Sequence, residues 1–240
     1  SLKETVTSEH PTYIGGGTDI MPLLKNEVRD DKDFVFLKKI PELHVLEEKD
    51  GELIIGAAMT LAELAESALL NSRYAAIAQA SSLTASPQIR NIATVGGNIM
   101  QDRRCIYFNQ PHLWRSGLAC HEHLPILVTR FFVPAAEEGE RSGFYKYAMR
   151  TTIDFPIINF ALRCGGKRPA RLAAGAVAPH PVVMTETAAK IDSAATDDEV
   201  IAQAEDELRK LAMPIKEACM TPAVKRSLYR HVAMLLDLRK

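Results

Sequence analysis

Two glycine-rich segments constrain what this chain can fold into. The first is Gly15-Gly16-Gly17-Thr18-Asp19-Ile20, and the second, much further along, is Ala93-Thr94-Val95-Gly96-Gly97-Asn98-Ile99. Glycine at such places lets backbone N–H groups turn toward a ligand that a Cβ would keep away. Two such loops, converging in the fold, would hold the two halves of a dinucleotide's pyrophosphate. The pair therefore favours a flavin or nicotinamide site.

The first segment by itself has two interpretations. A strand over Thr12–Ile14, the glycines and then a helix over 19–26 would bring several N–H donors and the positive end of a helix dipole to one point, which suits phosphate. A strand-to-helix turn that simply needs glycine is the alternative. The segment is neither the nicotinamide fingerprint, which wants glycine where Asp19 and Ile20 stand, nor a P-loop.

Composition narrows the class of protein. The 240 residues are 47% hydrophobic and 25% charged, as in an ordinary globular protein, and the net charge is −1. This balance of charges argues against a general electrostatic attraction to nucleic acid or anionic lipid, so neither is expected as a partner. No apolar run is long enough for a bilayer, and the charged start lacks a signal-peptide core, so we expect a cytoplasmic protein without membrane contact.

Sequence patterns predict an α+β chain with two domains. Short strands and helices alternate at first, with a hairpin over Leu43–Ile55 and a capping box, Thr60–Glu63, that opens a helix through Leu70. Beyond residue 140 we expect a three-stranded antiparallel sheet and closing helices. The predicted strands are 144–147, 157–164 and 171–177, and the helices begin at the capping box of Thr196 and at Thr221.

The second glycine segment extends into the longer pattern Ile89-Arg90-Asn91-Ile92-Ala93-Thr94-Val95-Gly96-Gly97-Asn98-Ile99. With the first segment, this pattern resembles the flavin-binding medium subunits of the molybdenum hydroxylases, the group of xanthine dehydrogenase and carbon monoxide dehydrogenase. Further matches in the same order are Asp154-Phe155-Pro156, Gly175-Ala176-Val177-Ala178-Pro179-His180-Pro181 and residues 221–236. The resemblance covers nearly the whole chain.

The resemblance implies a two-subdomain FAD-binding domain of the PCMH type over residues 1–140 and a small α+β domain over 141–240. FAD would lie between the two subdomains, with its pyrophosphate on the first segment. Lys146 matches a basic residue near the flavin in relatives. The cofactor-binding residues implied are Ile14, Gly15, Gly16, Gly17, Thr18, Asp19, Ile20, Thr94, Gly96, Gly97, Asn98 and Lys146. No residue is predicted to be catalytic, because the redox chemistry belongs to the cofactor.

The segment after the second glycines departs from most relatives. It resembles the 4-hydroxybenzoyl-CoA reductase branch, whose flavin subunit inserts a loop with four cysteines that hold a 4Fe–4S cluster. Cys105 and Cys120 match the first two by context, and the other two are absent. Two cysteines cannot complete a four-thiolate cluster, although His121 and His123 would offer substitutes or a zinc site, and a solvated loop is the alternative. The second flavin subdomain looks incomplete after His123.

These observations predict the FAD-binding, electron-transfer subunit of a molybdenum-dependent oxidoreductase. The resemblance implies as partners a small subunit with 2Fe–2S clusters, a large molybdopterin subunit and an external electron carrier such as ferredoxin or NAD. A flavin-free structural or assembly module that retains the fold is the first alternative. Another flavoenzyme of the same broad fold, such as a carbohydrate oxidase or a cell-wall reductase, is the second.

The first glycine segment yields a testable prediction. On the sequence alone, Gly16→Val should abolish flavin retention and leave the chain folded, because the valine side chain would take the place of the pyrophosphate. Flavin content and circular dichroism of the purified variant measure the two properties. Unchanged flavin content would remove this segment from the site.

Overall fold

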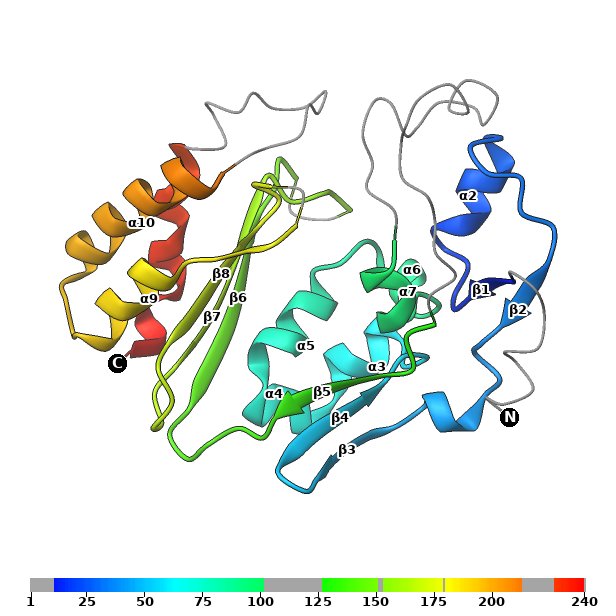
Figure 1. The fold of residues 1–240 in the computed structure, drawn as a ribbon, viewed down its shortest axis with the longest axis horizontal. Coiled ribbons are helices and arrows are strands. Elements are labelled where there is room, and N and C mark those ends of the chain that lie inside the picture. The colour runs from blue at the N-terminus through cyan, green and yellow to red at the C-terminus, as the bar shows by residue number, and fades with distance from the viewer. Residues whose placement is uncertain (1–10, 102–126, 151–152, 179, 213–226, 240) are drawn as a thin grey trace. The chain divides into compact units, whose positions relative to one another are not determined.

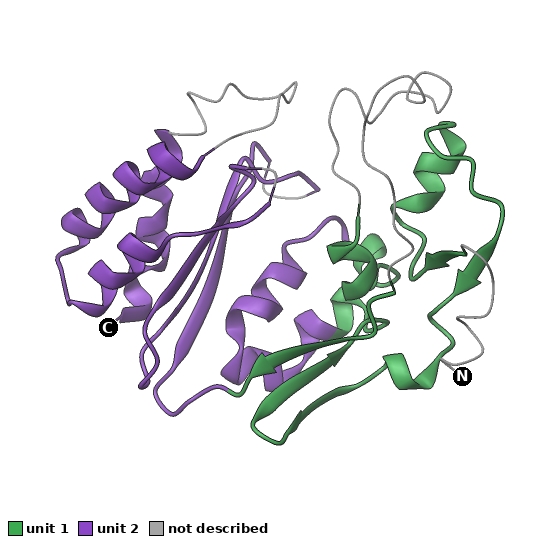
Figure 2. Ribbon diagram, in the orientation of Figure 1, with its two compact units in different colours: residues 1–63, 87–135 green, residues 64–86, 136–240 purple. Residues whose placement is uncertain are grey.

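The computed structural model describes residues 11–101, 127–150, 153–178, 180–212 and 227–239 (Figure 1). Contacts within the chain divide it into two compact units (Figure 2). Unit 1 comprises Ser1–Glu63 with Pro87–Ala135, and unit 2 comprises Leu64–Ser86 with Ala136–Lys240. Residues 64–86 therefore group with the C-terminal part of the chain. The division into domains 1–140 and 141–240 rests on sequence patterns and stays a prediction.

Unit 1 contains a small parallel sheet that leads into the first glycine segment. Strand β1 (Thr12–Ile14) pairs with β2 (Phe34–Phe36). Helix α2 (Ile20–Lys25) follows the glycines, with Asp19 at its N-cap position. Ile14 is buried at the end of β1, which anchors the start of the glycine turn. The structure confirms the strand–glycine–helix order expected from the sequence.

A three-stranded antiparallel sheet forms the second part of unit 1. The 3₁₀ helix η1 (Pro41–Leu43) leads into β3 (Leu46–Lys49), and β4 (Glu52–Gly56) lies between β3 and β5 (Arg130–Pro134). The predicted hairpin is confirmed, and its turn residues Asp50 and Gly51 have φ of 52° and 80°. Sequence patterns did not single out β5, because its partner β4 lies far away in the chain.

Short helices follow β4. They are α3 (Leu61–Glu66), α4 (Ala68–Arg73), α5 (Ala75–Ser82), α6 (Pro87–Arg90) and α7 (Val95–Ile99). The predicted capping box at Thr60 is confirmed. The helix predicted to run from there through Leu70 is wrong in length, because α3 ends at Glu66 and the Ser67 hydroxyl accepts the Leu70 N–H at 3.3 Å to cap α4. A serine hydroxyl that caps a new helix competes with continuation of the old one.

Unit 2 is built on a four-stranded antiparallel sheet in the order β6-β7-β8-β9. Its strands are β6 (Arg141–Tyr147), β7 (Ile158–Cys164), β8 (Arg171–Gly175) and β9 (Val182–Val183). The three predicted strands are confirmed, and the short β9 adds a fourth. Alternate residues of β7 are buried, as expected for a strand with one face on a core. That core also includes Leu172, Met184, Val200, Leu208 and Leu236.

Helices lie on both faces of this sheet. Helix α5 packs on β6, and on the other face lie α9 (Thr185–Asp192), α10 (Asp197–Leu211) and the 3₁₀ helix η2 (Leu228–Arg239) (Figure 1). The predicted capping box of Thr196 is confirmed at the start of α10. The predicted helix start at Thr221 lies outside the described residues. No helix in the described part of the chain combines the length and apolar character needed to cross a bilayer.

Side-chain hydrogen bonds explain why α4 and α5 belong to unit 2. Arg73 donates to the Ala136 carbonyl at 2.8 Å, and the Tyr74 hydroxyl accepts the Ala136 N–H at 3.1 Å. The Gln79 side chain accepts the Phe144 N–H at 2.7 Å, next to the middle of β6. Because each of these bonds satisfies a backbone group of a distant segment, the helices are held on the sheet in one place.

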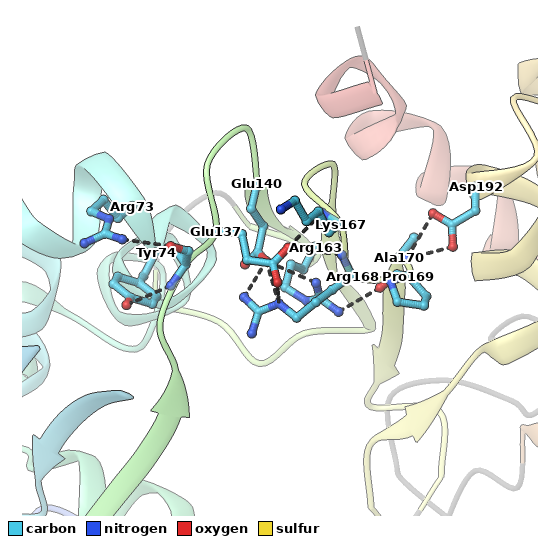
Figure 3. A network of polar contacts seen from close by, with 11 residues as sticks. Arg73, Tyr74, Glu137, Glu140, Arg163, Lys167, Arg168, Pro169, Ala170 and Asp192 are labelled. Atoms are coloured by element: carbon cyan, nitrogen blue, oxygen red, sulfur yellow. Dashed lines mark hydrogen bonds and ion pairs between the residues drawn. The ribbon is translucent and has the colours of Figure 1, made fainter. Parts of the chain in front are cut away.

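A polar network fixes the connection that enters β6 (Figure 3). The Glu137 carboxylate accepts the backbone N–H groups of Lys167 at 2.7 Å and Arg168 at 3.1 Å. These hydrogen bonds hold the pKa of the Glu137 carboxyl below its usual value, and the bond from the Lys167 N–H has the largest effect. Glu140 binds the guanidinium groups of Arg163 and Arg168. The β7–β8 hairpin is therefore joined to this connection by charge-assisted hydrogen bonds.

A buried carboxylate of α10 caps the neighbouring helix α9. Glu207 is 3% exposed and accepts the N–H groups of Glu186 at 3.0 Å and Thr187 at 2.8 Å. It also accepts the Thr187 hydroxyl at 2.7 Å. An N-cap usually comes from the residue before the helix, whereas here it comes from a second helix. The contact therefore fixes the packing of α9 on α10 as well as the start of α9.

We expect Glu207→Gln to lower the free energy of unfolding by roughly 1–3 kcal/mol, because the amide nitrogen cannot accept a buried N–H. Urea unfolding of the whole chain measures this loss. Glu205→Gln is the matched control, since Glu205 lies on the same helix and pairs with the exposed Arg209. Equal losses in the two variants would contradict a special role for Glu207.

Candidate functional site

The first glycine segment forms the turn between β1 and α2 and presents backbone donors. Gly17 has φ of 73°, a conformation that suits glycine, and its carbonyl accepts the Met21 N–H at 3.0 Å. Within the described residues, the N–H groups of Gly15, Gly16, Gly17 and Thr18 have no hydrogen-bond acceptor. A run of adjacent backbone donors in such a turn is a typical anion site.

The second glycine segment uses its donors internally. Thr94 is the N-cap of α7, and its hydroxyl accepts the Gly97 N–H at 3.2 Å. The N–H of Val95 donates to Met59, that of Gly96 to Ala57 and that of Asn98 to the Thr94 carbonyl, at 2.8–2.9 Å. This segment would therefore contact a ligand through side chains and carbon surface, not through N–H groups.

The two segments are in direct contact. A Cβ added to Gly15 would lie 2.2 Å from Thr94 Oγ1, and one added to Gly16 would lie 2.1 Å from the Ile92 carbonyl oxygen. Both separations are far below any non-bonded contact, so only glycine allows this approach. The expectation that Gly16→Val leaves the chain folded is therefore wrong, because the valine would meet the backbone of the second segment before any ligand.

The paired glycines of the second segment differ in what surrounds them. A Cβ at Gly96 would lie 2.8 Å from the Cβ and 2.9 Å from the carbonyl oxygen of Ala57, in a buried position. A Cβ at Gly97 would meet only Thr94 Oγ1, at 3.1 Å, and Gly97 is exposed. Gly96 therefore serves packing inside unit 1, whereas Gly97 leaves open surface.

Residues that follow β4 hydrogen-bond to the second glycine segment and hold it in place. Thr60 pairs with Thr94 in an antiparallel bridge, and the Leu61 N–H donates to the Ala93 carbonyl at 2.9 Å. Thr60 is itself fixed by Glu63, whose carboxylate accepts its N–H and hydroxyl, both at 2.7 Å. Burial acts to raise the pKa of Glu63, but these hydrogen bonds outweigh it and hold the pKa below its usual value.

A carboxylate also anchors the strand that precedes the first segment. Asp31 accepts the Thr12 hydroxyl and pairs with the Arg29 guanidinium. Burial acts to raise the pKa of Asp31, and the hydrogen bonds from Arg29 and Thr12 lower it by more. Sequence reasoning missed both this group and the supporting role of Thr60, because neither has a local motif that points to the glycines.

The remaining predicted site residues lie in different settings. Asp19 and Ile20 are half-buried at the start of α2. Lys146 belongs to unit 2, where its ammonium donates to the carbonyls of Leu83, at 2.9 Å, and Asp154. Cys105 and Cys120 lie outside the described residues. Over the part of the chain that the structure describes, no group of histidine, cysteine and acidic residues is placed to hold a metal ion.

The residues present fit one part of FAD. The adjacent N–H groups of Gly15 to Thr18 match the oxygens of a pyrophosphate, which carry negative charge and only accept hydrogen bonds. On the second segment, the exposed Gly97 offers carbon surface to a ligand, and the half-buried Asn98 offers an amide. The arrangement supplies binding and orientation, and any redox chemistry would come from the bound group.

Two family models match nearly the whole chain. The FAD binding domain in molybdopterin dehydrogenase matches residues 1–136, and the CO dehydrogenase flavoprotein C-terminal domain matches residues 143–235. The xanthine dehydrogenase FAD-binding subunit of Escherichia coli O157:H7 is 32% identical over 197 residues, which cover 70% of this chain and 68% of that protein. The carbon monoxide dehydrogenase medium chain of Hydrogenophaga pseudoflava is 31% identical over 86 residues, 36% and 30% of the two chains.

Solved structures show the same fold. Carbon monoxide dehydrogenase from Hydrogenophaga pseudoflava, in a form lacking the Mo-pyranopterin moiety, matches with a TM-score of 0.77 and 20% identity over 97% of this chain and 89% of that chain. Quinoline 2-oxidoreductase from Pseudomonas putida 86 matches with a TM-score of 0.75 and 18% identity over 95% and 88%. These matches confirm the predicted α+β fold.

The contrast between the paired glycines can be tested by stability. We expect Gly96→Ala to lower the free energy of unfolding by about 1–3 kcal/mol, because the methyl group overpacks against Ala57. Gly97→Ala should change the free energy of unfolding by less than about 1 kcal/mol, since the better helix propensity of alanine opposes the tight contact of its methyl group with Thr94 Oγ1. Thermal and urea unfolding measure both. Equal destabilisation of the two variants would contradict the difference in packing.

Proposed function

Because this chain belongs to the FAD-binding subunits of the molybdenum hydroxylases, we propose that it binds the pyrophosphate of FAD on the first glycine segment. Family membership is what the sequence motifs predicted, and the family matches confirm it at that level. The observation that carries the proposal is the run of N–H groups from Gly15 to Thr18 that lack acceptors within the described residues.

Each part of the site has a role in this proposal. The N–H groups of the first segment bind the pyrophosphate, and the Thr18 hydroxyl offers one more donor. The exposed surface at Gly97 and the Asn98 amide would lie beside the cofactor, and Lys146 stays a predicted contact because it matches a basic residue near the flavin in relatives. FAD held by these residues would supply the redox chemistry. The protein's groups hold and orient it, and none acts as a general acid or base.

The partners follow from the family. We propose assembly with an iron–sulfur subunit and a molybdopterin-binding large subunit in a multi-subunit complex, which the matches to xanthine dehydrogenase and carbon monoxide dehydrogenase proteins support. Electrons would pass between the 2Fe–2S centres, the flavin and a carrier such as ferredoxin or NAD. We place this complex in the cytoplasm, without nucleic acid or membrane as partner.

The segment with Cys105 and Cys120 supports a finer proposal. Its sequence resembles the 4-hydroxybenzoyl-CoA reductase branch, in which electrons flow toward the substrate. We propose that these two cysteines supply two of the ligands of an iron–sulfur cluster, with the others from elsewhere in the chain or its complex. Iron bound in stoichiometric amount by the purified chain, and lost in Cys105→Ser, would support this.

A flavin-free module that retains the fold is the competing function. It predicts that the exposed surface at Gly97 has no ligand to meet, so that substitution there changes no binding property. FAD binding predicts the opposite. The two functions therefore differ at a residue whose replacement is compatible with the fold.

We expect the purified chain to show flavin absorption bands and to release FAD on denaturation. Gly97→Ala should weaken FAD binding by about tenfold or more, since a methyl group on a surface that faces a ligand costs roughly 1–3 kcal/mol through overpacking. Fluorescence titration with FAD measures this, and unchanged thermal unfolding of the variant is the control. A chain that stays colourless and cannot be reconstituted with FAD would favour the structural module.

A further inference from the structure

We propose that Asp31 is a positioning residue, which sets the place of the first glycine segment from the far end of strand β1 and does not itself touch the cofactor. The inference rests on the proposed FAD site and goes beyond it, because it assigns a role to a group outside both glycine segments. Asp31 closes the stretch that begins at Thr12 into a loop, and this loop carries the N–H donors of Gly15 to Thr18.

Asp31 lies at the end of β1 that is opposite to the glycine turn. Its carboxylate accepts the hydroxyl of Thr12, the first residue of β1, whereas Gly15 follows the last residue, Ile14. The N–H of Thr12 donates to the Asp33 carbonyl at 2.9 Å, so Thr12 is held twice by the segment before β2. Three residues of strand separate the two ends of β1 by about 10 Å, which keeps the carboxylate away from a pyrophosphate on the glycines.

The chain returns from α2 to the start of β1 through a helix end of defined geometry. Glu27, just beyond α2, has φ of 57°, and its N–H donates to the Leu24 carbonyl at 3.1 Å. The N–H of Val28 donates to the Leu23 carbonyl at 2.9 Å. These two bonds are those of a Schellman motif, and the buried pair Leu23 and Val28 supplies its apolar contact. The end of α2 therefore fixes the direction in which the chain leaves the helix.

An ion pair completes the return. Arg29 directly follows the Schellman motif, and its Nε donates to Oδ2 of Asp31 at 2.6 Å, while Oδ1 accepts the Thr12 hydroxyl. Both charged side chains are largely buried, at 20% and 16% exposure. The strand β1, the glycine turn, α2 and the return segment thus form a closed loop that is joined at Thr12. The closure holds both arms of the glycine turn in place, and donors that are fixed before binding lose less freedom when the ligand arrives.

Positioning predicts a result opposite to that of simple electrostatics. Removal of a negative charge from the neighbourhood of an anionic ligand should strengthen binding or leave it unchanged. If Asp31 acts by closing the loop, Asp31→Asn should instead weaken FAD binding by about fivefold or more, because donors that are less well held lose more freedom on binding. Asp33→Asn is the matched control, since it removes the same charge from an exposed residue nearby, and it should bind FAD at least as tightly as the parent chain. Fluorescence titration of the full chain with FAD measures both.

The Thr12 hydroxyl links the carboxylate to the strand. Thr12→Val removes the hydroxyl at nearly the same shape, and Thr12→Ser keeps it. Thr12→Val should weaken FAD binding as Asp31→Asn does, and Thr12→Ser should bind FAD like the parent chain. The double variant with Thr12→Val and Asp31→Asn should bind little more weakly than either single variant, because the two changes break one interaction. Losses that add in full would contradict action through Thr12.

A second site separates positioning from a general loss of stability. Glu27 is exposed and adopts a left-handed conformation that favours glycine, so Glu27→Gly should raise the temperature of unfolding without a change at Thr12 or Asp31. In the double variant with Glu27→Gly and Asp31→Asn, positioning predicts that thermal unfolding returns toward that of the parent chain while FAD binding stays weak. Recovery of FAD binding together with stability would show a merely structural role. The same background serves if Asp31→Asn alone fails to fold.

Glycine amide signals report the placement of the turn without any cofactor. The chain has 13 glycines, so ¹⁵N-glycine labelling gives a readable spectrum of the full FAD-free chain. Positioning predicts that Asp31→Asn shifts the signals of Gly15 to Gly17, whereas Gly165 and Gly175 of unit 2 keep theirs. Unshifted signals of the turn would overturn the proposal. If not even the parent chain binds FAD, the proposed function fails, while these spectra still decide whether Asp31 places the glycine turn.

Discussion

The close approach of the two glycine segments is the constraint on which the rest of unit 1 depends. Gly15 lies against the Thr94 hydroxyl and Gly16 against the Ile92 carbonyl, at positions where any Cβ would overlap another atom. The Gly16 backbone meets the Ile92 backbone and the Gly15 backbone meets the Thr94 side chain, so a shift of one segment would displace the other. The strand β1, the helix α2 and the helix α7 all start or end at this contact, so their relative placement follows from it.

This contact also explains how one turn comes to offer so many donors. The second segment satisfies its own N–H groups through Ala57, Met59 and Thr94, and therefore behaves as a rigid support. The first segment is held by van der Waals contact and by its flanking strand and helix, so its N–H groups stay available to a ligand. The two segments look alike in sequence but differ in the hydrogen bonding of their N–H groups within the described residues, and the donors of the first suit an anionic group.

Unit 2 relies on a different principle, the satisfaction of backbone groups by distant side chains. Gln79 bonds the backbone of β6, Glu137 bonds the β7–β8 hairpin, and Glu207 caps a neighbouring helix. Each bond joins segments that lie apart in the sequence, and in each a side chain of one segment satisfies a backbone group of the other. Such bonds account for the grouping of residues 64–86 with the C-terminal part, which no local pattern indicates.

Local patterns in the sequence determined the elements and the family. The glycines, the capping boxes of Thr60 and Thr196, the Asp50-Gly51 turn and the alternation in β7 each act over a few residues, so they can be recognised without the fold. Only the tertiary structure decided what depends on contacts between distant residues. It paired β5 with β4, broke the helix at Ser67, and showed that Gly15, Gly16 and Gly96 serve packing while Gly97 is open. The physical reason is that a glycine has the same sequence signature whether the space beside it is filled by its own chain or left for a ligand.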